Sequence, residues 1–225
     1  VILVLSFSLS GSDLKIFLNL HSFIVVFLGT VAVAFFSTPL NSMNNTLKAI
    51  FLLFSKDKGF NDIKEDLINL AKNRNNYRPK SKLPLIDFAS ELWVKGVSPD
   101  SFNHLLKQKY EEIASITEQP IGVIRNLAKY PPALGMTGTV MGMISLFSTL
   151  SSDNKATIGQ SLAIAMTATF YGLILSNLFL LPLADRLNVK FHATLSRDKS
   201  VFEALIKINH GEPWQVVEEV NIEQE

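Results

Sequence analysis

The sequence contains no cysteine and few charged residues. Without cysteine it can form no disulfide, no thiolate–metal site and no thiol redox centre. Only 18% of its 225 residues are charged, whereas soluble proteins contain about 25%. The formal net charge is +1, which argues against an electrostatic surface for nucleic acid, and no nucleic-acid partner is expected.

Charged residues are absent from three long stretches. No Asp, Glu, Lys or Arg occurs at positions 16–47, 130–152 or 156–184. Since a helix needs about 20 apolar residues to cross a bilayer, these stretches predict membrane spans. The opening "VILVLSFSLS" is apolar but shorter, and we interpret residues 1–10 as the end of a further, truncated first span; a frayed apolar terminus is the alternative. The later spans are predicted at residues 16–37, 131–150 and 158–182.

Basic residues are distributed unevenly between these spans. Fourteen Lys and Arg lie between Pro39 and Tyr130 and five from Arg186 onward, but only one lies in each of the turns Gly11–Lys15 and Ser151–Lys155. The positive-inside rule therefore places residues 38–130 and 183–225 in the cytoplasm and both turns outside. The sequence predicts an all-α membrane protein with four transmembrane helices, a helical cytoplasmic domain between spans two and three, and a cytoplasmic C-terminal helix.

The cytoplasmic region has helical periodicity. In "NDIKEDLINLAKN" apolar residues recur three and four positions apart, which predicts an amphipathic helix. "SPDSFNHLLKQKYEEIASI" opens with Ser98 and Pro99, residues favoured at a helix cap and in a first turn. The prolines and polar residues of "NNYRPKSKLP" predict a loop. The helix that follows the fourth span is expected to end at Gly211.

The third and fourth spans carry small residues at helical spacing. The third, "YPPALGMTGTVMGMISLF", has three glycines on one face, and the fourth has alanine, serine and glycine at intervals of three or four. In lipid, small residues let helices approach closely. Plain bundle packing explains these faces. The residues predicted to pack are Gly135, Gly138, Gly142, Ala165 and Gly172.

Two threonines, Thr139 and Thr169, lie at the centres of these small faces. A threonine within a membrane helix commonly bonds the carbonyl four residues earlier. Alternatively, hydroxyl oxygens suit a hard cation such as Na⁺, and the pair would line an ion pathway. No carboxylate lies within the predicted spans, so a proton relay would need an acid from a partner.

The sequence shows no pattern typical of an enzyme. Its four histidines are scattered, and no nucleophile–base pairing or metal-ligand spacing accompanies them. We therefore expect no catalytic residues, no bound metal and no cofactor, only a transported ion. The histidines are His21, His104, His192 and His210.

Three stretches in order resemble one known family: "HSFIVVFLGTVAVAFFSTPL", "PALGMTGTVMGMISLFSTL" and "IGQSLAIAMTATFYGLILSNLFLLPLADRL". They are similar to the MotA/PomA flagellar stator proteins of the MotA/TolQ/ExbB superfamily. The resemblance covers nearly the whole chain, including the tail "HGEPWQVVEEV". It looks closest to the sodium-type PomA branch, which has Thr in the motif matching "GTVMG", whereas proton-type members tend to have Ala at the place of Thr139.

This resemblance implies a stator subunit in the bacterial inner membrane, in contact with lipid. Five copies would surround a dimer of a MotB/PomB-type single-span protein, which supplies an essential Asp and binds peptidoglycan. Flow of Na⁺, which is favoured, or of H⁺ would turn the ring and push a FliG-type rotor switch protein. The family motifs assign Pro132 and Pro182 to this coupling. A simple helix start and stop is the alternative reading of the two prolines.

The chain departs from the family where the rotor is contacted. Asn103 and Ser115 stand where PomA-like proteins have Arg and Glu. Neighbouring charged residues remain as candidates, although a solvated helix face is the alternative. The candidates are Lys107, Lys109, Glu111 and Glu112.

Two other functions fit the same pattern. An ExbB/TolQ-type protein, which energises outer-membrane processes, shares the "GTV-G" span but usually has one span before its cytoplasmic domain. A non-conducting membrane scaffold would carry no ion with any partner. The neighbouring gene would discriminate, since a stator requires a single-span partner with a membrane Asp.

Overall fold

The computed structural model describes residues 18–53, 60–73, 77, 79–81, 83–149 and 155–212. The expected end of a first span at residues 1–10 lies outside them, as does most of both turns. Every regular element in the described part is helical, which confirms the predicted all-α fold. The helices are α2 (Leu20–Ser37), α3 (Leu40–Leu53), α4 (Phe60–Lys72), α5 (Pro84–Val94), α6 (Pro99–Leu127), α7 (Tyr130–Thr149), α8 (Lys155–Ile174), the π-helix η2 (Leu175–Leu180) and α9 (Leu181–Asn209).

The chain divides into two compact units. The first unit contains the described residues up to Thr46 together with Ile121–Asp185, and the second contains Leu47–Pro120 and the described residues from Arg186. Helices α3, α6 and α9 each begin in one unit and end in the other. Each unit has its own packing, and each is described separately below.

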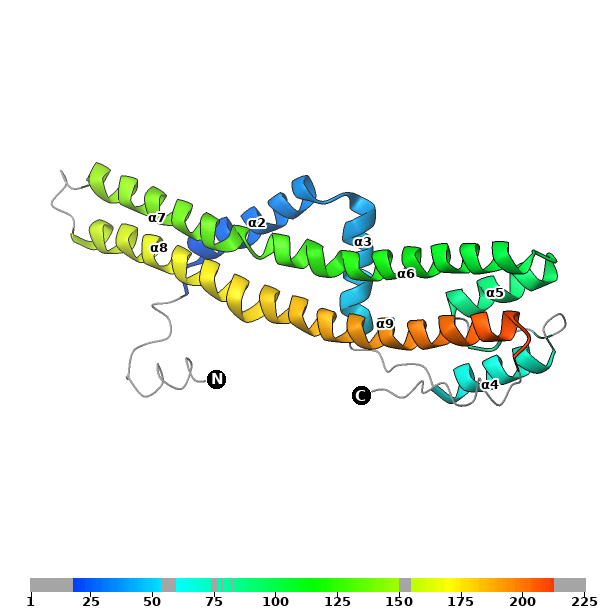
Figure 1. The fold of residues 1–225 in the computed structure, drawn as a ribbon. Helices are drawn as coiled ribbons and strands as arrows, with labels where there is room; N and C mark the ends of the chain where they lie inside the picture. The colour runs from blue at the N-terminus through cyan, green and yellow to red at the C-terminus, as the bar shows by residue number, and fades with distance from the viewer. Residues whose placement is uncertain are drawn as a thin grey trace. The chain divides into compact units, whose positions relative to one another are not determined.

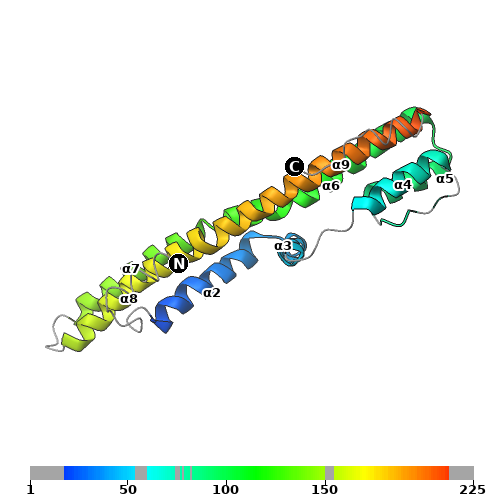
Figure 2. The ribbon, with the colours of Figure 1, turned by 90° about the horizontal axis from the view of Figure 1, so that it is seen from below.

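In the first unit, α7 and α8 run side by side and α2 packs against both (Figures 1 and 2). Asn19 caps α2, because its side chain accepts hydrogen bonds from the backbone N–H groups of His21 and Ser22 at 3.1 and 3.3 Å. The outer face of α2 exposes large apolar residues, among them Phe27, Leu28 and Phe36. Such a surface is typical of a helix that faces lipid or other apolar helices.

Two helices in the described part are long and apolar enough to cross a membrane. They are α2, with a mean hydropathy of 2.1, and the continuous helix Ile158–Asn209, with 1.8. Helix α7 is not among them, although it carries no charge, because its prolines, glycines and threonines reduce its mean hydropathy. The third span predicted at residues 131–150, and with it the count of four spans, stays a prediction.

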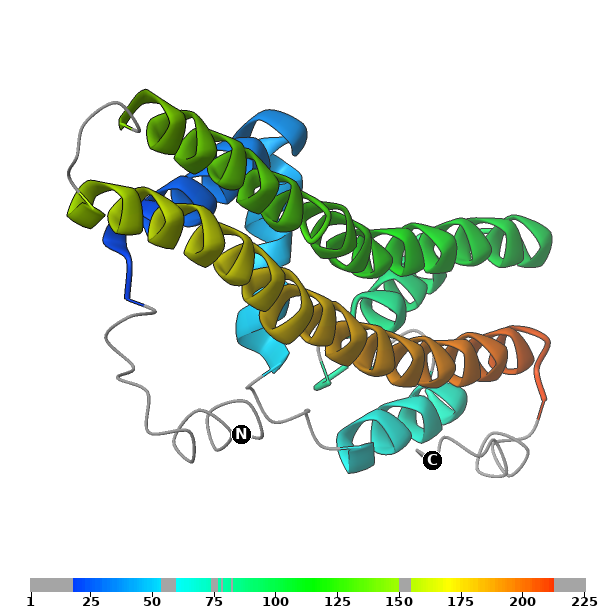
Figure 3. The same ribbon diagram turned by 90° about the vertical axis from the view of Figure 1, so that its left-hand side faces the viewer.

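The chain continues as one helix from α8 through η2 to the end of α9 (Figure 3). The alternative that Pro182 stops a helix is therefore wrong, because Pro182 is the second residue of α9. The helix ends as predicted, since Gly211 follows it in the left-handed region with φ 82°.

The second unit has the large-residue core of a water-soluble helical domain. Helices α4, α5, α6 and α9 bury leucine, isoleucine and phenylalanine against one another. The apolar stripe predicted on α4 is buried, and α6 begins at Pro99 as predicted. The loop predicted over "NNYRPKSKLP" ends one residue early, because Pro84 occupies the first position of α5. The largest fully buried apolar side chains of this core are Leu67, Leu70, Ile86, Phe102, Leu106, Val201, Leu205 and Ile208.

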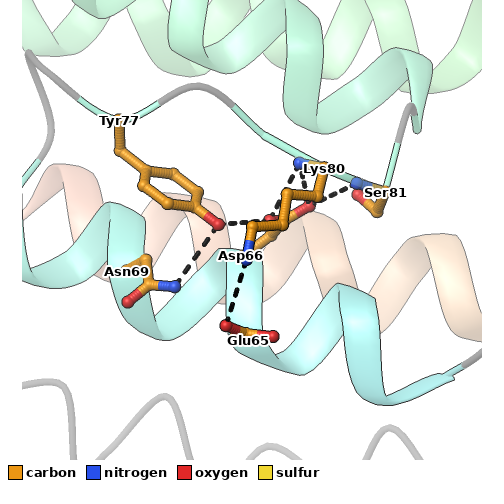
Figure 4. A network of polar contacts seen from close by, with 6 residues as sticks. All are labelled: Glu65, Asp66, Asn69, Tyr77, Lys80 and Ser81. Atoms are coloured by element: carbon orange, nitrogen blue, oxygen red, sulfur yellow. Dashed lines mark hydrogen bonds and ion pairs between the residues drawn. The ribbon is translucent and has the colours of Figure 1, made fainter.

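A buried carboxylate organises the segment between α4 and α5 (Figure 4). The side chain of Asp66 is 1% exposed. It accepts hydrogen bonds from the Tyr77 hydroxyl at 2.7 Å and from the backbone N–H groups of Lys80 at 3.0 Å and Ser81 at 2.7 Å. Burial alone would raise the pKa of Asp66, but hydrogen bonds from Ser81, Lys80 and Tyr77 outweigh it and hold that pKa below its usual value.

Candidate functional site

The structure brings Thr139 and Thr169 together between α7 and α8. Their hydroxyl oxygens lie 2.5 Å apart. Thr139 Oγ1 also lies 3.1 Å from the carbonyl oxygen of Gly135 and 3.2 Å from that of Ala165. Thr169 Oγ1 lies 3.3 Å from the Gly135 carbonyl oxygen. We call these four oxygens, two hydroxyl and two carbonyl, the oxygen cluster.

The oxygen cluster combines both readings of the threonines. Thr139 bonds the carbonyl four residues before it, as a membrane threonine commonly does. Each hydroxyl also crosses to the other helix: Thr139 reaches Ala165, four residues before Thr169, and Thr169 reaches Gly135, four residues before Thr139. Each threonine hydroxyl therefore contacts a carbonyl oxygen of the opposite helix, and all four oxygens lie close together between α7 and α8.

Small residues make this approach possible. A Cβ built at Gly138 would lie 2.5 Å from the Ala168 Cβ, and one at Gly142 would lie 2.7 Å from the Ala165 Cβ. A Cβ at Gly135 would lie 2.9 Å from the Ala168 carbonyl oxygen. Real Cβ atoms do not approach other atoms this closely, so any larger residue would separate α7 from α8 and open the oxygen cluster.

Further hydroxyls, at positions that were not predicted as sites, form hydrogen bonds across these helices. Ser22 of α2 is buried and donates to the Ile164 carbonyl at 2.8 Å, while its oxygen lies 2.8 Å from the Thr167 hydroxyl. The Ser145 and Ser161 hydroxyls lie 3.1 Å apart between α7 and α8. These positions could have been predicted from the sequence, because a serine in an uncharged span needs a hydrogen-bond partner on its own helix or on a neighbouring one.

The oxygen cluster contains no titratable group. No Asp or Glu lies between Tyr130 and Thr149 or between Ala156 and Ala184. The site can therefore offer neutral oxygens to a cation, but it cannot itself take up and release a proton. Beside it, α7 exposes an apolar face that nothing in the described part of the chain covers. That face consists of Met136, Val140, Met143, Ile144 and Phe147.

The two predicted coupling prolines lie on different helices of the first unit. Pro132 is half-buried in the first turn of α7, as a simple helix start would have it, beside the fully buried Pro131. Pro182 is exposed and is the second residue of α9, one residue after the end of η2. Gly172 packs against the Pro131–Pro132 turn, where an added Cβ would overlap the Pro131 carbonyl oxygen.

The candidate rotor-contact residues lie on α6 in the second unit, as two ion pairs. Lys107 Nζ is 3.9 Å from Glu111 Oε1, and Lys109 Nζ is 2.9 Å from Glu112 Oε2. Three of the four side chains are more than half exposed, while Lys109 is 29% exposed and lies over the Phe88 ring.

The two positions that depart from the family pattern differ in their surroundings. Asn103 accepts a hydrogen bond from the Asn209 side chain at 3.2 Å, which ties α6 to the end of α9. Asn103 therefore has a hydrogen-bond partner within the second unit. Ser115, in contrast, is exposed.

Comparison with known proteins defines the class. The model of the MotA/TolQ/ExbB proton channel family matches residues 74–199, more than half of the chain, and the chain belongs to this family. It is 25% identical to Motility protein A of Treponema phagedenis over 93% of this chain and 84% of that protein. It is 29% identical to chemotaxis protein PomA of Vibrio alginolyticus over 57% of this chain and 50% of that protein.

A solved structure shows the same fold. In the flagellar MotAB stator complex from Bacillus subtilis, one chain matches with a TM-score of 0.80 and 18% identity, over 96% of this chain and 88% of that chain. The chain thus resembles proteins named Motility protein A and one named PomA, and the sodium-type assignment remains a proposal.

Proposed function

We propose that this chain is the ion-channel-forming subunit of a flagellar stator, which couples ion flow to torque on a rotor. Its family, its relatives named for motility and its fold support the proposal. The observation that carries it is the oxygen cluster, because oxygens that converge in an uncharged helix pair suit the passage of a cation.

The oxygen cluster favours Na⁺ over H⁺. A sodium ion that leaves water must replace its hydration oxygens, since an uncompensated ion in an apolar medium costs several kcal/mol. Two hydroxyls and two carbonyls offer that replacement, provided that the Thr139 and Thr169 hydroxyls part and turn their protons away. A proton needs only water and a carboxylate.

The missing carboxylate implies a partner. A MotB/PomB-type protein with one span would place its Asp near Thr139 and Thr169, and five copies of this chain would surround a dimer of it. The uncovered apolar face of α7 is suited to partner helices. Movement would pass through the helix irregularities at Pro132 and Pro182 to the α6 surface, which would push a FliG-type switch protein.

This proposal requires a defined topology in the bacterial inner membrane. The uneven distribution of Lys and Arg places residues 38–130 and 183–225 in the cytoplasm. A cysteine at Asn154 should react with an impermeant thiol reagent in intact cells, and one at Asn75 should react only after permeabilisation. The opposite labelling would reverse the topology and place the rotor-contact residues on the wrong side.

Complementation tests the function itself. In a motile strain that lacks its own stator, this chain and its cognate single-span partner should restore rotation of tethered beads. Replacement of the partner's membrane Asp by Asn should abolish rotation without preventing assembly. Assembly without rotation, combined with restored energy-dependent transport across the outer membrane in a second strain that lacks its own ExbB/TolQ-type energiser, would identify an ExbB/TolQ-type protein instead. Assembly without any ion flux would identify a scaffold.

A further inference from the structure

The junction of α6 and α7 lacks a backbone hydrogen-bond donor. The two helices are separated only by the turn at Ala128–Lys129, and Pro131 and Pro132 follow it. In a regular α-helix the N–H of residue 132 would donate to the carbonyl of Ala128. Proline has no N–H, so Pro132 cannot supply this hydrogen bond. Ala128 is 3% exposed, and an unpaired carbonyl there would cost free energy.

The missing donor is replaced from another helix. The hydroxyl of Ser176, which is 3% exposed, donates to the Ala128 carbonyl oxygen at 2.6 Å. We infer that Ser176 is a positioning residue that substitutes for the N–H absent from Pro132. Its hydrogen bond joins the α6–α7 break to the π-helix before Pro182.

The local backbone explains how Ser176 reaches this carbonyl. A serine within an α-helix often donates to the carbonyl four residues earlier, which here is that of Gly172. Ser176 lies instead in η2, where the Leu181 N–H donates to the Ser176 carbonyl five residues back. Such wide turns interrupt α-helices, frequently at functional sites. Gly172 also lets the Pro131 carbonyl approach α8 without a Cβ in the way.

The consequence, which rests on the proposed function, concerns coupling. Helices α6 and α9 both continue into the second unit, and each has an irregular point within the first. Because Ser176 joins the α6–α7 junction at Pro132 to η2, which precedes Pro182, these two irregular points move together. Loss of the hydroxyl should therefore reduce torque more than assembly.

A double-mutant cycle tests the pairing in the purified complex with the single-span partner. Ser176→Ala removes the donor, and Pro132→Ala restores a backbone N–H that can take its place. Ser176→Ala should lower the thermal midpoint by about 3 °C in the native background, and by less than a third of that shift in the Pro132→Ala background. Ser148→Ala is the control, since its exposed hydroxyl bonds only within α7, and it should change neither midpoint.

A second measurement keeps the inference testable if the Pro132 variant does not assemble. The chain has two Ala–Lys pairs, Ala71–Lys72 and Ala128–Lys129. Carbonyl-¹³C alanine with ¹⁵N-lysine therefore gives two solid-state NMR correlations, and Lys129→Arg identifies one. Ser176→Ala should move the Ala128 carbonyl signal upfield, as loss of a hydrogen bond does, and leave Ala71 unchanged.

Equal midpoint shifts in both backgrounds, or an unmoved Ala128 carbonyl signal, would overturn the inference. The function is judged separately, by torque. If the cycle and the carbonyl shift appear but the native complex never drives rotation, the hydrogen-bond pairing stands and the stator proposal fails. If Ser176→Ala assembles and keeps full torque, Ser176 has no part in coupling.

Discussion

The two units of this chain pack in opposite ways. The second unit buries leucine, isoleucine and phenylalanine and exposes charged side chains. The first buries glycine, alanine, serine and threonine and exposes phenylalanine, leucine and methionine. A core of large apolar residues needs water outside it to drive burial, whereas close contact of small residues works where the surroundings are as apolar as the side chains. The contrast indicates that the two units are built for different solvents.

The units also differ in how buried polar groups are satisfied. In the second unit a charged carboxylate, Asp66, receives several donors from one loop. In the first unit neutral hydroxyls bond carbonyls on neighbouring helices, as Thr139 and Ser176 do. A membrane interior penalises charge heavily, so hydroxyls replace carboxylates there.

The largest expected effect separates the two kinds of packing. Phe102→Ala should destabilise the second unit by about 3–5 kcal/mol, because it leaves a cavity where Phe102 stacks on Trp93. Phe36→Ala in the first unit should leave unfolding unchanged, since Phe36 is 94% exposed. Denaturant unfolding of the purified complex, followed by the helical circular dichroism signal, measures both. Equal losses would contradict the contrast between the units.

The next effect tests the small-residue contact. Gly142→Ala should destabilise the α7–α8 pair by about 1–3 kcal/mol through overpacking, because its Cβ would meet the backbone of α8. Gly122→Ala is the matched control, since no atom lies within 4 Å of its added Cβ, and it should stabilise α6 by up to about 1 kcal/mol. Thermal unfolding and the size of the detergent-solubilised complex should be measured for both variants. A harmless Gly142→Ala would remove the argument for close packing.

A smaller effect concerns pH in the second unit. Since the pKa of Asp66 is lowered by folding, its ionised form stabilises the fold at pH values above the unfolded pKa. That contribution is lost as the pH falls through the still lower folded pKa. Asp66→Asn should cost about 1–2 kcal/mol at neutral pH and abolish this part of the acid dependence. Acid titration of unfolding in both proteins checks the prediction, and parallel curves would show that Asp66 contributes nothing to the acid dependence.

The smallest effect on stability is expected at the α6 surface. Lys107→Ala should change unfolding by no more than about 0.5 kcal/mol, because an exposed ion pair contributes little. If this face meets the rotor, torque should nevertheless fall, and Glu111→Lys should lower it further. Bead rotation beside a stability measurement separates the two roles. Unchanged torque in both variants would leave Lys107 and Glu111 as a solvated helix face.

Much of the helical framework could be predicted from the sequence. Local signals are strong in the apolar spacing of α4, at Pro99 where a helix begins, and at Gly211, which takes the left-handed backbone after a helix end. The small faces of the third and fourth spans were also visible, but the sequence does not say which faces meet. That Thr139 meets Thr169 depends on how two helices are oriented against each other.

Other features depend on partners far along the chain. Pro182 alone would predict a helix stop, yet the helix continues through it from η2 into α9. Ser176 and Ala128 are 48 residues apart, and nothing local links them. The Asp66 hydrogen bonds depend on a loop whose composition predicts only irregular backbone. In each case a tertiary contact overrides or completes a local preference.

Rotation speed as a function of Na⁺, at fixed pH and ionic strength, tests the central claim that the oxygen cluster conducts the driving ion. With this chain and its partner as the sole stator, native speed should rise with Na⁺. Thr139→Ala should reduce that response well beyond any loss of assembly, while Thr139→Ser, which keeps the oxygen, should retain part of it. Rotation that ignores Na⁺ and stops with a protonophore would contradict the sodium assignment, and full Na⁺-driven speed in Thr139→Ala would contradict the role of the oxygen cluster.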